Sequence, residues 1–300
     1  MLSNLSVLIN APVFNISLIV DGVLIGAIFA LAAYGLALVW GVTSVKNLAQ
    51  GDFVIMGGYC AWYATYLGVP PLLGLPIAMV VMALFGWVTF HLVVKHVIHR
   101  DLFTSLLATF GMAMVIEAGL NLGFGADVQS VNPGFGSYYL FGGLVSISKM
   151  KLIAFVLAGL LAVGIVIFMK SSRMGRAIRA TAQDPRAARV LGIDTEKVYA
   201  FTFTLNAAIC GAAGALVVMI WVIHPFIGVS YSIRSFVIVT AAGLGNLPGV
   251  IAVGLAMGIL EQFGGFIMGA QYEQAIVVLL LLLVLVVRQI QQARVRQVVQ

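Results

Sequence analysis

Long stretches of apolar residues, separated by short polar segments, cover almost the whole chain. About 20 consecutive apolar residues allow a helix to cross the hydrocarbon core of a bilayer, which is roughly 30 Å thick. Apolar runs occur at residues 17–43, 53–68, 72–94, 102–124, 151–169, 198–222, 234–246, 249–268 and 272–288. This pattern predicts an all-α polytopic membrane protein, which we expect to form a single transmembrane domain over residues 1–300.

Two places break the pattern. The run at 234–246 is too short to span a bilayer comfortably, and the polar segment from Lys46 to Phe53 directly precedes a long apolar run. Interrupted helices are a recurrent way to build transport sites, although an ordinary cytoplasmic loop explains Lys46 equally well. We predict about eight transmembrane helices with one or two broken or half-helices near 44–52 and 234–249.

The composition agrees with a membrane protein. Hydrophobic residues make up 62% of the chain and charged residues 9%, and the mean hydropathy is +1.11. A soluble globular protein is therefore excluded. Cys60 and Cys210 both lie in apolar segments, where cysteine behaves as a small hydrophobe, so neither a disulfide framework nor a metal site is expected. No Lys or Arg precedes the first apolar run, so a removable signal peptide is not expected.

The distribution of basic residues predicts the orientation, because cytoplasmic loops are enriched in Lys and Arg. With the N-terminus outside, 13 of the 16 basic residues lie on the cytoplasmic side, and only Lys149, Lys151 and Arg234 remain outside. The C-terminus is then cytoplasmic, which requires that one of the apolar runs does not cross. The external segment 125–150 contains Asn-Pro, glycines and aromatic residues and predicts an ordered turn or short hairpin. The net charge of +6 follows from the cytoplasmic loops and gives no reason to expect nucleic acid as a partner.

The basic segment RATAQDPRAARVLGID lies between two apolar runs. Asp184 followed by Pro185 is typical of a helix N-cap with proline at the first helical position, and Gly192 follows where a left-handed C-terminal cap belongs. We predict a helix of about two turns within the cytoplasmic loop 170–197. So short a helix must pack against something to be stable, which favours a docking element over a simple orientation anchor. The docking residues are Asp184, Pro185, Arg186, Ala187, Ala188, Arg189, Leu191 and Gly192.

Polar side chains inside apolar runs are candidates to line a pathway, because an unpaired polar group in hydrocarbon is costly. Glu117 and Glu261 are the carboxylates deepest in apolar runs, and Asn121 lies one turn from Glu117 as a candidate hydrogen-bond partner. A carboxylate near a helix end has the alternative of reaching the interface, and His224 and Arg234 flank an expected external loop. The pathway candidates are Asn47, Gln50, Asp52, Glu117, Asn121, Asn206, Asn246 and Glu261.

Pairs of glycines four residues apart allow helices to approach closely. They occur at Gly22/Gly26, Gly119/Gly123, Gly245/Gly249, Gly254/Gly258 and Gly265/Gly269. In a chain with 33 glycines, several such pairs are expected by chance, so the spacing alone predicts no particular contact.

The basic loop sequence GRAIRATAQDPRAARVLGI resembles the cytoplasmic coupling loop of ABC importer permeases, whose two alanines and later glycine are matched by Ala187, Ala188 and Gly192. The segments GVTSVKNLAQGDFVIMGGY and AAGLGNLPGVIAVGLAMGILE resemble permeases of the branched-chain amino acid uptake family. The similarity extends over residues 17–288. The chain departs from the general coupling pattern at Arg186, where that pattern has glutamate, and in lacking its downstream proline.

The resemblance implies an ABC importer permease architecture, of the shorter of the family's two permease types. It implies a bacterial inner-membrane complex with a second, different permease, two ATPase subunits and a periplasmic binding protein. The implied substrates are branched-chain or other hydrophobic amino acids, and similar permeases carry urea, short amides or aromatic carboxylates. None of the six lysines follows a glycine, so the Gly-Lys of a phosphate-binding loop is absent. We expect no cofactor in this chain, with ATP and magnesium bound by the partner ATPases.

Two other classes of membrane protein fit the sequence less well. A membrane-embedded enzyme would need a catalytic set, but the sequence has no His-Glu-x-x-His, no Gly-x-Ser-x-Gly and no cluster of His, Asp and Glu. We therefore expect no enzymatic activity. An ATP-independent channel or carrier could share the glycine-rich bundle, but it would have no use for a capped cytoplasmic docking helix.

Overall fold

The computed structural model describes residues 8, 12–43, 45–98, 100–140, 145–243 and 245–298. The long apolar runs fall in helices, as the pattern predicts. The helices are α2 (Pro12–Thr43), α3 (Gln50–Tyr66), α4 (Gly74–Thr89), α5 (Lys95–Val97), α6 (Leu102–Phe124), α7 (Lys149–Ser171), α8 (Arg173–Gln183), α9 (Pro185–Val190), α10 (Thr195–Val218), α11 (Gly228–Ala242), α12 (Leu247–Met268) and α13 (Glu273–Val298). Short 3-10 or π segments are η1 (Pro71–Leu73), η2 (Phe90–Val94), η4 (Pro225–Ile227) and η5 (Ala270–Tyr272).

Seven helices in the described part of the chain are long and apolar enough to cross a membrane, and the shorter apolar helix Ala270–Val286 is an eighth candidate. The remaining run, α3, has only 17 residues and begins at Gln50, inside the polar segment that breaks the pattern. The expected short run at 234–246 belongs to a longer helical segment, Pro225–Ala242, because the polar residues before Arg234 are helical too. The predicted all-α polytopic architecture is confirmed.

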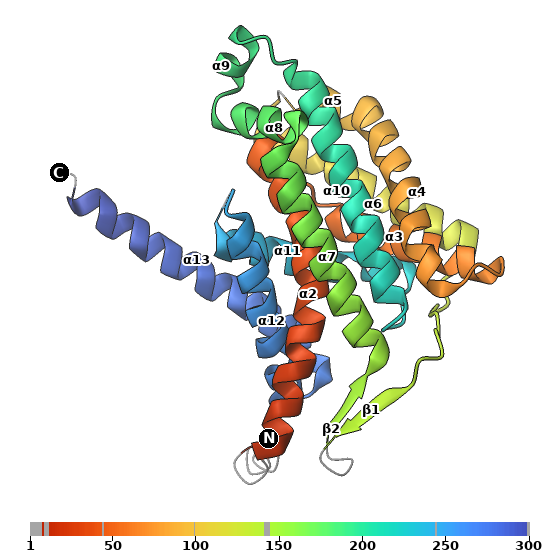
Figure 1. The fold of residues 1–300 in the computed structure, drawn as a ribbon. Helices are drawn as coiled ribbons and strands as arrows, with labels where there is room; N and C mark the ends of the chain where they lie inside the picture. Colours follow the sequence, from red (N-terminus) through yellow and green to blue (C-terminus); the bar gives the residue numbers. More distant parts are fainter. Residues whose placement is uncertain are drawn as a thin grey trace.

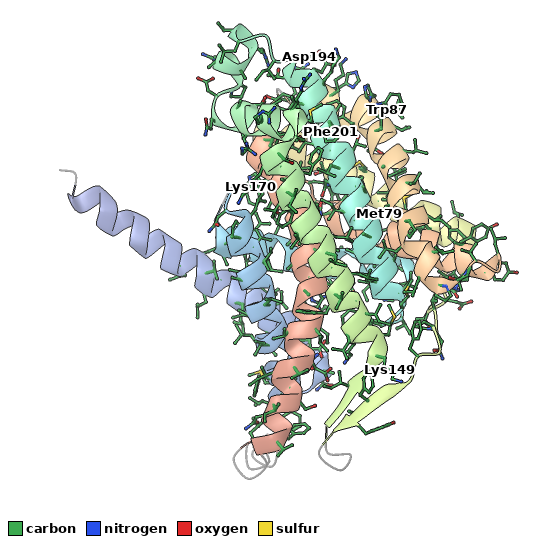
Figure 2. The ribbon with its side chains drawn as sticks, viewed as in Figure 1. Met79, Trp87, Lys149, Lys170, Asp194 and Phe201 are labelled. Atoms are coloured by element: carbon green, nitrogen blue, oxygen red, sulfur yellow. The ribbon has the colours of Figure 1, made fainter. Side chains whose placement is uncertain are left out.

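The bundle has two distinct ends (Figure 1). Helices α8 and α9 lie at one end, which we call the α9 end, and the start of α2 and the strands β1 (Ser137–Leu140) and β2 (Val145–Ser148) lie at the other, which we call the hairpin end. The strands pair antiparallel, with Ser137 opposite Ser148, so the expected hairpin in segment 125–150 is confirmed. Figure 2 shows Lys149 at the hairpin end and Asp194 at the α9 end.

The core is built around α10, which packs against α2, α3 and α4, while α12 packs along α2. Small residues let these helices approach closely. At Gly214 of α10 an added Cβ would meet the backbone carbonyl of Val54 in α3. Close backbone approach is how helices gain packing energy in lipid, where the hydrophobic effect no longer drives association.

Helix α13 leaves the bundle near the hairpin end and slopes away from the other helices (Figure 1). It contacts α11 and α12. Leu279, Leu282 and Leu283 on its apolar surface are exposed. An apolar surface of this kind suits lipid or a second membrane subunit.

Candidate functional site

Helix α9 has both predicted caps. The Asp184 carboxylate accepts hydrogen bonds from the backbone N–H groups of Arg186 (2.8 Å) and Ala187 (3.1 Å), and Pro185 occupies the first turn. At the other end Gly192 has φ of 84°, its N–H donates to Arg189, and the N–H of Ile193 donates to Ala188. This is a Schellman cap, which satisfies the free carbonyls at a helix end. The Asp-Pro and Gly signals therefore identified the helix and both of its ends.

The exposed side of α9 is more apolar than its sequence suggests. Ala188 is buried against the rest of the protein, whereas Val190 is 88% exposed and Leu191 is 80% exposed. Arg186 is also exposed. Two exposed branched side chains beside a cation form a surface suited to contact with another protein. We call Val190 and Leu191 the α9 knob.

Several arginines of the loop hold α8 and α9 in place. The guanidinium of Arg179 donates to the carbonyl of Met169, and that of Arg176 donates to Ser171 (2.9 Å), so both satisfy carbonyls at the C-terminal end of α7. Such positions also suit a cation because of the helix dipole. Arg189 donates from Nε to the Thr195 hydroxyl (2.8 Å) and so ties α9 to the start of α10. Part of the positive charge of this loop is therefore structural.

Asp194 begins α10 as its N-cap. Its carboxylate accepts from the backbone N–H of Lys197 (3.1 Å), and the Lys197 ammonium lies 3.0 Å away. These hydrogen bonds hold the pKa of Asp194 below its usual range. The cap stays charged at neutral pH and fixes the junction between α9 and the transmembrane bundle.

Gln50 and Asn206, from the list of pathway candidates, meet in the core where α3 begins. The Gln50 amide donates to Ala32 in α2 (2.8 Å) and to the Asn206 side chain (3.1 Å), and Asn206 donates back to Gln50 (3.2 Å). Both residues are fully buried. This amide pair joins α2, α3 and α10 at the point where the chain is interrupted.

We expect Gln50→Leu to destabilise the permease by about 1–3 kcal/mol, because the Asn206 amide loses its side-chain partner in a buried site. Asn206→Ala should have a similar effect. The double variant should lose less than the sum of the two, because removing both partners leaves no unsatisfied amide. Thermal unfolding in detergent measures this cycle, and strictly additive losses would contradict the coupling of the pair.

Asn47 and Asp52 flank the amide pair on either side of the break. The Asn47 side chain accepts from the N–H of Ala49 (3.2 Å) and so shapes the entry to α3. Ser232 of α11 completes the join, since its hydroxyl accepts from Gly51 and donates to Leu48, both at 2.8 Å. Both oxygens of Asp52 are buried and lack a hydrogen-bond partner within the described residues.

The other candidates lie in different places. Glu117 and Asn121 are half-buried on α6, and no hydrogen bond joins them in the described part of the chain, so the expected pairing is not found. Asn246 is the N-cap of α12, where it accepts from Gly249 (3.1 Å) and donates to Ala242 (3.2 Å). It therefore has a structural role at the turn between α11 and α12.

Arg234 and Glu261 form a buried ion pair between α11 and α12. Arg234 Nε donates to Glu261 Oε1 at 2.9 Å, and the side chains are 12% and 7% exposed. The expectation that Arg234 flanks an external loop is wrong, because the residue lies inside α11. One sequence signal could have identified this pair: Arg234 is the first residue of the apolar run 234–246. An arginine in a membrane segment suggests a buried partner.

Comparison with known proteins adds independent evidence. The model of the family described as "Branched-chain amino acid transport system / permease component" matches residues 18–287. Three similar proteins are high-affinity branched-chain amino acid transport system permease protein BraD of Pseudomonas aeruginosa, the corresponding protein LivH of Escherichia coli K12, and a probable branched-chain amino acid transport permease protein LivH of Methanocaldococcus jannaschii. They are 30%, 28% and 31% identical to this chain, cover 90%, 89% and 82% of it, and are themselves covered over 92%, 91% and 80% of their lengths.

Proposed function

The chain belongs to the family of branched-chain amino acid transport system permease components, and we propose that it forms one half of the membrane pathway of an ATP-driven importer. Its partners in that importer are a second, different permease, two ATPase subunits and a periplasmic substrate-binding protein. The chain supplies a gated path and a mechanical contact, and the ATPase subunits bind and hydrolyse ATP. The substrates are branched-chain or other hydrophobic amino acids, and the names of two relatives assign branched-chain amino acid transport to those proteins.

The observation that carries the ATP-driven mechanism is the capped helix α9 with its exposed knob. Val190 and Leu191 project from the end of a bundle of membrane-spanning helices, and Arg189 and Asp194 fix α9 to the start of α10. A force on α9 therefore reaches α10, which packs against α2, α3 and α4 in the core. A passive channel or carrier has no need of such a contact, and none of the reported relatives favours one.

The proposed orientation has the α9 end in the cytoplasm of a bacterial cell, the N-terminus outside and the C-terminus inside. It is supported by the distribution of lysines. Lys95 pairs with Glu196 at the start of α10, and Lys170 and Lys197 lie at the ends of α7 and α10 that adjoin α8 and α9, whereas Lys149 and Lys151 lie at the hairpin end. The arginines of α8 and α9 add further positive charge to the α9 end, as expected for a cytoplasmic face.

A reconstitution experiment tests the proposal. The tagged chain is purified from its native host with the subunits that remain bound, inserted in proteoliposomes loaded with ATP and magnesium, and supplied with the binding protein outside. We expect ATPase subunits and a second permease to co-purify, and leucine uptake to require both ATP and the binding protein. Urea, a short amide and benzoate serve as alternative substrates.

The possible outcomes separate the alternatives. Uptake of urea, an amide or benzoate in place of leucine would keep the ATP-driven mechanism and replace the substrate. Solute flux through the chain alone, without ATP, would contradict the importer and support a channel or carrier.

A further inference from the structure

A cavity of about 520 Å³ lies among α2, α11, α12 and the start of α13. Its volume falls within the range of roughly 300–1,000 Å³ that is typical of small-molecule sites. It is lined by residues from the middle of α2, the last part of α12 and the segment η5, and the latter two place it toward the hairpin end of the bundle (Figure 1). The lining residues on which the inference depends are Ile25, Phe29, Val222, Arg234, Glu261 and Glu273.

The charged part of this cavity is the ion pair between Arg234 and Glu261. A buried ion pair contributes little net stability, because removing both charges from water costs about as much as their attraction returns. Charged groups inside membrane segments are rare and usually serve a pathway or a ligand. The pair in this chain also lines a cavity of ligand size, which a purely structural pair between packed helices does not require.

Arg234 has binding capacity left after it pairs with Glu261. The central carbon of its guanidinium lies 5.1 Å from the centroid of the Phe29 ring and 5.5 Å from that of Tyr231, so two cation–π contacts limit its movement. Its hydrogen bonds in the described part of the chain use Nε and Nη2. Nη1 is then free for a carboxylate, and a guanidinium fixed by its carboxylate partner and two aromatic neighbours is well suited to bind one in a defined direction.

The acidic residues suit a cation. Glu261 and Glu273 both line the cavity, so the lining carries two carboxylates and one guanidinium. Arg234 neutralises one carboxylate, that of Glu261. An ammonium group placed between the two carboxylates would neutralise the remaining charge, that of Glu273. Ile25, Phe29 and Val222 provide an apolar surface in the same cavity. A ligand with a carboxylate, an adjacent ammonium and an apolar side chain complements all three features.

We propose that this cavity binds the zwitterionic head of a hydrophobic amino acid during transport, with its carboxylate on Arg234 and its ammonium on Glu261 and Glu273. The inference rests on the proposed function, and it names the site at which this chain contacts the substrate. The hairpin end is external in the proposed orientation, so the cavity is where a substrate released by the binding protein would first enter. The Gln50–Asn206 pair is a weaker candidate, because both amides are fully buried and already satisfy each other.

The test uses the complete complex in proteoliposomes with Arg234→Gln and Glu261→Gln combined. Amides replace both charges of the ion pair, so neither partner is left as an uncompensated charge, and the half-buried Glu273 carboxylate stays in the cavity. We expect leucine uptake to fall at least about tenfold, since charge-assisted bonds to the substrate are lost. Retention of the ATPase subunits and the melting temperature should stay close to those of the wild type.

A matched control neutralises the Lys151–Asp21 pair (2.9 Å), which joins α7 to α2 outside the cavity. Lys151→Gln with Asp21→Asn should leave uptake unchanged.

A second variant covers the case in which the charge variant does not assemble. Val222 lines the cavity and is about half exposed, so Val222→Trp narrows the space without touching the ion pair. We expect the ratio of leucine uptake to valine uptake to fall several-fold, as a smaller pocket discriminates against the longer side chain. An unchanged ratio, or wild-type leucine uptake in the charge variant, would overturn the inference.

The wild-type complex separates this inference from the proposed function. If the wild type takes up leucine and the cavity variants do so equally well, the site is wrong and the importer remains. If the wild type takes up no amino acid, the proposed substrate is wrong, and the site with it.

Discussion

Replacing Val190 and Leu191 together by aspartate will abolish ATP-driven uptake, while the chain still folds and inserts. Both side chains are almost fully exposed, so their replacement removes little packing within the permease. In the proposed complex they are buried against the ATPase, where two carboxylates would lack partners. A charge left buried and unpaired at an interface costs about 2 kcal/mol or more, so we expect ATPase affinity to fall at least about tenfold. The measurements are the ATPase retained on the tagged permease and the rate of uptake.

The control for this variant keeps the knob apolar. Val190→Ile with Leu191→Met preserves size and hydrophobicity and should retain both the ATPase and transport. Arg186→Glu tests the charge of the same face separately, since Arg186 is exposed. Arg189 is unsuitable for this purpose, because it also holds Thr195 at the start of α10. Normal ATPase retention and uptake in the double aspartate variant would exclude docking through the knob.

The features of this protein that could be predicted from sequence depend on nearby residues. The apolar runs predicted the helices because length and hydropathy decide whether a segment can cross a bilayer. Asp184, Pro185 and Gly192 predicted helix α9 because a cap acts over three or four residues. The break before α3 was visible for the same reason, since the polar segment and the helix start are adjacent in the chain.

The role of Arg234 could not be predicted in this way. Its partner Glu261 is 27 residues away on the next helix, and only the packing of α11 against α12 brings the two together. Counting Lys and Arg by loops assigned Arg234 to the outside, because that rule considers charge without considering partners. The exposure of Val190 could not be predicted either, because the sequence of a six-residue helix does not reveal which of its sides packs against the rest of the protein.

The glycine pairs show most directly what tertiary structure adds. Gly22, Gly26, Gly254 and Gly258 lie where α2 crosses α12, and an added Cβ at each would meet backbone of the other helix or, at Gly254, also the Ala30 side chain. At Gly119 and Gly123 of α6, which have the same spacing, an added Cβ would meet no atom within 4 Å. Equal spacing in the sequence therefore corresponds to a tight crossing in one case and to open space in the other.

We accordingly expect Gly258→Leu to destabilise the permease strongly. Its Cβ would meet the carbonyl oxygen of Gly22 and the backbone of Gly26, and backbone atoms within a helix cannot rotate away as a side chain can. The two helices would have to separate, and we expect a loss at the upper end of the overpacking range, about 3 kcal/mol. The measurements are the amount of protein in the membrane and the melting temperature in detergent.

Gly119→Leu is the matched control, because it makes the same chemical change in the same spacing motif, in the interior of α6. A leucine in a helix interior is intrinsically more favourable than glycine, so this variant should be as stable as the wild type or slightly more stable. A comparable loss in both variants would mean that the added side chain, and not the α2–α12 crossing, is the cause. A loss confined to Gly258→Leu would show that the close approach of α2 and α12 requires glycine at this position.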